Sequence, residues 1–142
     1  MTKKQPKQLE RPGVDRLGRT PLHDVANGGN LGEAASLLAN GADPNARDDN
    51  GWTPLHFAAQ SGAIQVASLL LKHGAEVDAA DSNGNTPLFR AVFACTGDGS
   101  LISVLRAAGA DPWLENSHGM SPVALASNIA NRDVRQFFAD LQ

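Results

Sequence analysis

Apolar residues recur at a helical spacing in short stretches of the chain, and turn residues separate these stretches. Leu55, Ala58 and Ala59 share one face of a helix at the i, i+3, i+4 spacing. The segment 66–70 repeats this spacing with one valine and two leucines. Gly62, between the two stretches, can end a helix in the left-handed conformation. The pattern therefore predicts two short helices, each with one small apolar face.

The first of these helices carries a start signal in its own sequence. The side chain of Thr53 can cap the helix by accepting a hydrogen bond from a free amide. Pro54 stands at the first helical position, where the missing N–H has no helical partner in any case. A helix is therefore expected to begin at Pro54, after the turn that Asn50 and Gly51 predict.

The same signals return along the chain at a fixed period. "DRLGRTPLH" begins at Asp15, "DDNGWTPLH" at Asp48 and "DSNGNTPLF" at Asp81, each 33 residues after the last, and "NSHGMSPVA" begins at Asn116, 35 residues further on. The two extra residues fall within 93–100, "FACTGDGS". Two short helices with one apolar face each cannot form a core alone. Successive copies are therefore expected to stack and to bury these faces against one another.

The repeated pattern resembles the ankyrin repeat family. The second copy matches that family's pattern at Gly51, Thr53 to His56, Ala58, Ala59, Gly62, Leu69, Leu70 and Gly74 to Ala79. The resemblance implies an all-α, ankyrin-repeat solenoid of four stacked helix-turn-helix units, with projecting β-hairpin loops and a concave binding face. The domain is expected at 15–142, with units at 15–47, 48–80, 81–115 and 116–142, after a basic and disordered N-terminal tail at 1–14.

Both ends of the array are more polar than its middle. Glu33 and Ser36 stand where the second copy has Val66 and Leu69. In the last helix, the segment 135–140 combines charged and polar residues with two phenylalanines that supply apolar bulk for docking inward. A surface without a neighbouring repeat is expected to be polar, so this pattern argues against a structural fragment of a larger scaffold.

Composition narrows the range of partners and compartments. The net charge is −3 and the estimated pI is 5.7, which gives no general attraction to nucleic acid or to an anionic membrane. No stretch approaches 18 apolar residues, and the cationic N-terminus leads into no apolar run. The single cysteine excludes an intramolecular disulfide. We therefore expect a cytoplasmic protein.

No metal, cofactor or catalytic site is predicted. His23 and His56 are the histidines of the T-P-L-H motif, which the resemblance implies are structural hydrogen-bonding residues between repeats. "DSNGNT" at Asp81 begins like a calcium loop, but Thr86 replaces the required glycine, so we interpret it as a turn. Cys95 has no residue placed by the sequence to activate it and is expected to be a small, buried or half-buried thiol.

One alternative from another functional class remains. An enzyme or small-molecule-binding protein would use the widened loop at 93–100 together with Arg90. The glycines of "TGDG" at Thr96 lack the lysine and preceding strand of a phosphate loop, so they are interpreted as serving the longer interhelix connection.

The resemblance implies that partners are bound by the turn residues and by the exposed face of each first helix. These positions are Arg16, Leu17, Arg19, Asp24, Asn27, Asp49, Asn50, Trp52, Phe57, Gln60, Ser61, Ser82, Asn83, Asn85, Arg90, Phe93, Ala94, Ser117, His118 and Met120. We therefore expect a non-catalytic protein-protein interaction module, monomeric when free, that occludes, inhibits or scaffolds its partner. An inhibitor or immunity-type protein is the narrower hypothesis.

Aromatic residues and an arginine are expected near the middle of that face. Trp52, Phe57, Arg90 and Phe93 form this group, which has the composition of a binding hot spot. Trp52 stands at a position that helical packing does not need, whereas Phe57 can equally fill a gap in the core and Phe93 can pack under the enlarged loop. Trp113 replaces the asparagine or aspartate of the earlier copies, so the sequence does not assign the conformation of its turn.

Overall fold

The computed structural model describes residues 12–129 and 134–141, and most of the expected tail at 1–14 lies outside these residues. The described residues form helices and turns and contain no strand. The elements are α1 (Pro21–Gly28), α2 (Leu31–Ala39), α3 (Pro54–Ser61), α4 (Ile64–Lys72), α5 (Pro87–Ala94), α6 (Ser100–Ala107), α7 (Pro122–Asn128) and the 3₁₀ helix η1 (Val134–Leu141).

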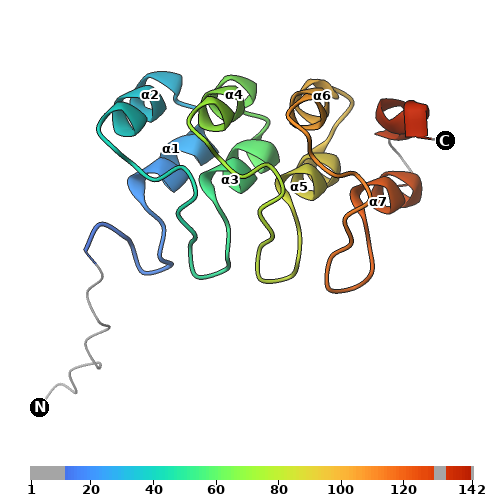
Figure 1. Ribbon diagram of the computed structural model, residues 1–142, viewed down its shortest axis with the longest axis horizontal. Helices are drawn as coiled ribbons and strands as arrows, with labels where there is room; N and C mark the ends of the chain where they lie inside the picture. The colour runs from blue at the N-terminus through green and yellow to red at the C-terminus, as the bar shows by residue number, and fades with distance from the viewer. Residues whose placement is uncertain (1–11, 130–133, 142) are drawn as a thin grey trace, which may run out of the picture.

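The helices stack in two parallel rows (Figure 1). One row contains α1, α3, α5 and α7, the other contains α2, α4, α6 and η1, and the long connecting loops project to one side. The two helices of each unit contact each other, α1, α3, α5 and α7 contact in succession, and so do α2, α4 and α6. The expected all-α solenoid is therefore confirmed. The last unit departs from the others because its second helix is a 3₁₀ helix.

Local signals account for the start of each first helix. The side chains of Thr53, Thr86 and Ser121 each accept a hydrogen bond from the third amide of the helix that follows, and a proline occupies each first turn. Gly62 ends α3 in the left-handed conformation, with φ of 76°. In contrast, α5 ends at Cys95 in extended backbone, where the widened loop begins.

Equivalent residues of successive units form one continuous core. Leu22, Leu55 and Leu88 are spaced by 33 residues and are all fully buried. Buried alanines accompany them on the same helices, and these small side chains let neighbouring helices pack closely. In the second row Leu70 is fully buried, whereas Leu69 is only partly buried. The two leucines therefore do not contribute equally to the stack.

The two ends of the array follow the polar pattern of the sequence. Glu33 and the other polar residues of that face of α2 are exposed. At the opposite end, Phe138 of η1 is buried. Arg106 of α6 holds η1 in place by a bidentate pair with Asp140, with nitrogen–oxygen distances of 2.8 and 2.7 Å, and by donating to the Phe137 carbonyl at 2.8 Å.

Candidate partner-binding face

Four similar turns form one edge of the candidate face. In the second turn, an Asp48 carboxylate oxygen accepts hydrogen bonds from the amides of Asn50 and Trp52, each at 2.9 Å. The first residue of each other copy accepts in the same way from residues two and four positions ahead. The "DSNGNT" segment is therefore a turn, as expected. These are tight turns, and not the strand pairs that the term β-hairpin implies.

Neighbouring turns are joined to one another. The Ser82 amide donates to the Asn50 carbonyl at 2.9 Å, and the corresponding bond recurs at the other two junctions. Gly51 allows this approach, because its φ is 76° and a Cβ atom there would lie 2.9 Å from the Ser82 nitrogen. The turns thus form one connected edge beside the first helices.

Two histidines connect the first three repeats, as the resemblance implied. His56 Nδ1 accepts from the Thr53 amide at 3.1 Å, and its Nε2 lies 2.8 Å from the Asn85 carbonyl. His23 has the same relation to the Trp52 carbonyl, at 2.9 Å. A carbonyl only accepts, so the hydrogen-bond network assigns the neutral tautomer with the proton on Nε2. Burial lowers the pKa of His56 from 6.5 to about 4, which keeps the ring neutral at pH 7.

The third repeat uses a different connection. Phe89 replaces the histidine and is buried. Its side chain has no hydrogen-bond donor, so it cannot donate to the next repeat. Instead, the side-chain amide of Asn116 donates to the Asn85 side-chain oxygen at 2.8 Å. Asn85 was expected among the partner-binding residues, but it is buried and joins two repeats. It therefore lies outside the accessible face, and the phenylalanine in "TPLF" was the signal for this change.

Three of the four residues expected at the centre of the face lie together. The Trp52 ring is 4.9 Å from the Phe57 ring, measured between centroids, and the Arg90 guanidinium carbon lies 4.6 Å above the Trp52 ring. Trp52 also packs at 5.7 Å from the His56 ring and is half-buried. The expectation that packing does not need Trp52 is therefore wrong. Phe57, half-buried against the core, fills the gap that the sequence allowed.

Arg90 has a structural role that the sequence did not indicate. Its Nη2 lies 3.4 Å from a carboxylate oxygen of Asp81. The Asp81 side chain has no exposed area and the Arg90 side chain is 18% exposed. Within the described part of the chain, the buried Arg90 Nε has no hydrogen-bond partner. Arg90 thus lies between Trp52 and Asp81.

The remaining expected residues differ in accessibility. Phe93 follows Arg90 by one turn of α5 and is 57% exposed, so it does not pack under the enlarged loop. Arg19 is half-buried and pairs with Asp15 at 3.0 Å and Asp24 at 3.9 Å. Met120 is also half-buried. Other exposed candidates are Arg16, Leu17, Asp24, Asn27, Asp49, Asn50, Gln60, Ser61, Ser82, Asn83, Ser117 and His118.

Trp113 keeps the local turn of the earlier copies. Its backbone amide donates to an Asp111 carboxylate oxygen at 2.9 Å, just as the Asn45 amide donates to Asp43. The Asn45 side chain also bonds to the next repeat through the Gly74 carbonyl. Trp113 has no carboxamide group and is 55% exposed. This exposed aromatic residue was not among the expected binding positions.

The alternative function depends on the widened loop together with Arg90. A cavity beside the loop is lined by residues of α3 to α6 and excludes Arg90. Cys95 is buried and donates to the Asp98 carbonyl at 3.6 Å, in agreement with the expected buried thiol. Among residues 12–129 and 134–141, no three His, Cys, Asp or Glu side chains are grouped to hold a metal ion. None of the described helices has the length and apolar character needed to cross a membrane.

Comparison with known proteins gives one family. The family model for ankyrin repeats, in three copies, matches residues 5–81 and 22–116. The matched residues cover more than half of the chain and include the first three sets of turns and first helices. No curated protein matches the chain.

Proposed function

The chain belongs to the ankyrin repeat family, and from this premise we propose that it is a non-catalytic protein that binds a partner protein with its turns and first helices. Ankyrin repeats generally mediate protein-protein interactions and are typically non-catalytic. The narrower proposal concerns the face used. It comprises the exposed residues of the turns and the solvent side of α1, α3 and α5.

The exposure of Phe93 beside a fixed arginine carries this proposal. Arg90 precedes Phe93 by three residues on α5, so both side chains lie on one side of the helix. Stacking on Trp52 and pairing with Asp81 hold Arg90 in place before a partner arrives. An exposed aromatic residue beside a preorganised arginine has the composition of a hot spot and loses little side-chain entropy on binding.

The proposed mode of action is that of a rigid array of repeats. A rigid repeat array that covers a partner's surface acts by occluding, inhibiting or scaffolding that partner. We place it in the cytoplasm as a monomer before binding, and an inhibitor or immunity-type role is the specific form proposed. Its net charge of −3 disfavours nucleic acid and anionic membranes as partners.

The experiment starts with the intact chain as bait to identify the bound protein by mass spectrometry. Calorimetry then compares the wild type with Phe93→Ala, which is expected to weaken binding by about 2 kcal/mol, or roughly thirtyfold. Because Phe93 is exposed, the melting temperature should stay unchanged. The matched control is Lys72→Ala on α4, an exposed residue of the other row. Loss of binding by the control alone would assign the interaction to the opposite side.

A further inference from the structure

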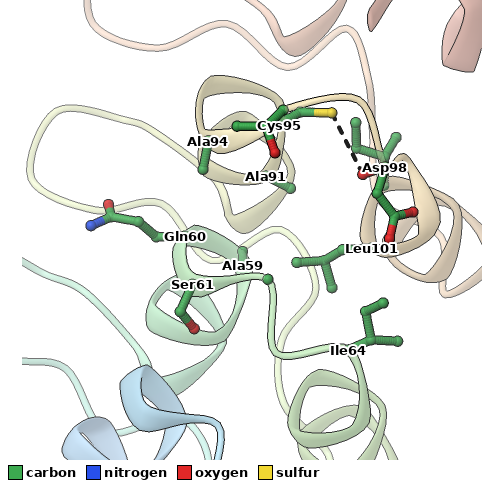
Figure 2. A pocket seen from close by; sticks show the side chains of 12 residues that line it. Ala59, Gln60, Ser61, Ile64, Ala91, Ala94, Cys95, Asp98 and Leu101 are labelled. Atoms are coloured by element: carbon green, nitrogen blue, oxygen red, sulfur yellow. Dashed lines mark hydrogen bonds between the residues drawn. The ribbon is translucent and has the colours of Figure 1, made fainter.

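A cavity of about 240 Å³ lies between the last turns of α3 and α5 (Figure 2). Six apolar residues from four helices line it together with polar residues. The wall residues are Ala59 on α3, Ile64 on α4, Ala91 and Ala94 on α5, and Leu101 and Ile102 on α6. Gln60 and Ser61 also line it, and both belong to the candidate partner-binding positions.

The cavity has a cause in the repeat sequence. At the preceding junction, the Ser61 hydroxyl lies 3.4 Å from the Ala26 carbonyl and bridges α3 to α1. Ala94 occupies the corresponding position one repeat later and has no hydroxyl group to bridge α5 to α3. The connection from α5 to α6 is also longer than the connection from α3 to α4. The junction between α3 and α5 therefore lacks the hydroxyl bridge of the earlier junction and lies beside a longer connection.

The charged group in the cavity lining is a carboxylate. Its lining contains the Asp98 carboxylate and no lysine, arginine or histidine. Hydrogen bonds from the Ser100 hydroxyl and amide lower the pKa of the Asp98 carboxyl, which is therefore ionised at neutral pH. The last turns of α3 and α5 border the same space, and the carbonyl end of a helix favours cations.

The volume limits the occupant to a narrow chain. A cavity of about 150 Å³ suffices for benzene, whereas pockets for drug-sized ligands begin at about 300 Å³. A lysine side chain combines a slender aliphatic stem with a compact positive charge at its end. An arginine ends in a broader planar group, and an aliphatic side chain brings no cation to the Asp98 carboxylate.

We infer that this cavity receives a lysine side chain of the partner protein. The stem packs against Ala59, Ala94 and Leu101, and the ammonium group meets the Asp98 carboxylate at the rim. The inference rests on the proposed function, since the partner supplies the lysine. It adds a cation-specific anchor next to the exposed positions Gln60 and Ser61.

The test uses the full chain and a small probe, so it needs no partner. Methyl and amide NMR spectra are recorded during titration with N-acetyl-lysine N-methylamide and, separately, with the norleucine analogue, which has no terminal ammonium group. The lysine probe is expected to produce saturable shifts at the methyl groups of Ala59, Ala94 and Leu101. The norleucine probe is expected to bind at least roughly threefold more weakly, because it lacks the ion pair.

Two variants separate the charge from the shape. Asp98→Asn keeps an oxygen for Ser100 but removes the charge, and should weaken the lysine probe roughly threefold to fivefold. Glu33→Gln, an exposed acid on α2, is the matched control and should change nothing. Ala94→Met fills the cavity and should abolish the shifts, with the melting curve confirming that the variant is folded.

Equal binding of the norleucine probe, shifts confined to other acidic residues, or no shifts at all would each overturn the inference. These results leave the proposed function untouched, because the Phe93 comparison tests that separately. Once the partner is known, Asp98→Asn should weaken it by a similar factor. An unchanged partner affinity would contradict the assignment of the lysine to the partner.

Discussion

His56 links two repeats through one buried, neutral ring, and this makes the junction sensitive to acid. Its pKa is 6.5 in an exposed chain and about 4 in the folded protein, because burial disfavours the charged form. Below pH 6.5 the unfolded chain therefore takes up a proton that the folded chain does not. The stability from the neutral ring is complete above pH 6.5 and decreases until the pH reaches about 4.

The expected loss is about 1.4 kcal/mol per pH unit within that window, or about 2 kcal/mol between pH 6.5 and 5. Urea unfolding at pH 7 and pH 5 measures it, at a pH where exposed carboxylates are still ionised. In His56→Gln this pH dependence should be smaller by the same amount, whatever the variant's stability at pH 7. A variant with the pH dependence of the wild type would show that His56 is not responsible.

Arg90 and Asp81 form an ion pair, and the removal of either residue has a defined consequence for stability. Arg90→Ala leaves the buried Asp81 carboxylate without its cation and removes the group stacked on Trp52. We expect a loss of about 2 to 3 kcal/mol in the free energy of unfolding. Asp81→Asn keeps the turn acceptor for Asn83 and should be less harmful in the Arg90→Ala background than in the wild type. Strictly additive losses would argue against coupling of the pair.

These side chains also show which residue roles can be predicted from the sequence. The roles of His23 and His56 follow from the repeat motif, and the structure confirms them. The stacking of Arg90 on Trp52 depends on how two repeats are superposed, which no local pattern specifies. For this reason Trp52 and Arg90 are more structural than the sequence indicated.

Among the helices, the second row offers a direct comparison of burial. Leu70 is fully buried and Leu69 only partly, although the sequence predicted equal roles. Leu70→Ala should cost about 3 kcal/mol in the free energy of unfolding through lost contacts and a cavity, and Leu69→Ala about half as much. Denaturant unfolding of both variants tests the order. A larger loss for Leu69→Ala would show that the register of α4 is wrong.

Helix boundaries were predictable where local chemistry sets them. Thr53, Pro54 and Gly62 bound α3 through a cap, a proline and a left-handed glycine, and all three signals lie in the sequence. The end of α5 at Cys95 and the 3₁₀ form of η1 have no such signal. η1 instead depends on Arg106, which lies 34 residues before its partner Asp140 and meets it only in the folded array.

The stacked architecture of the array could be predicted because the sequence repeats with a fixed period. A spacing of 33 residues, repeated with the same caps and turns, leaves stacking as the way to bury the apolar faces. The choice of binding face does not follow in this way. It depends on which side chains remain exposed after stacking, as Phe93 does and Asn85 does not, and it remains a proposal.

The most direct measurement of the proposed face is a hydrogen-exchange footprint of the intact chain with and without its bound partner. Amides of the turns at 48–52 and 81–85, together with those around Phe93, are predicted to exchange more slowly in the complex. Amides on the outer side of α2, α4 and α6 should exchange at unchanged rates. Slower exchange confined to α2, α4 and α6 would contradict the account, because the partner would then cover the opposite row of helices.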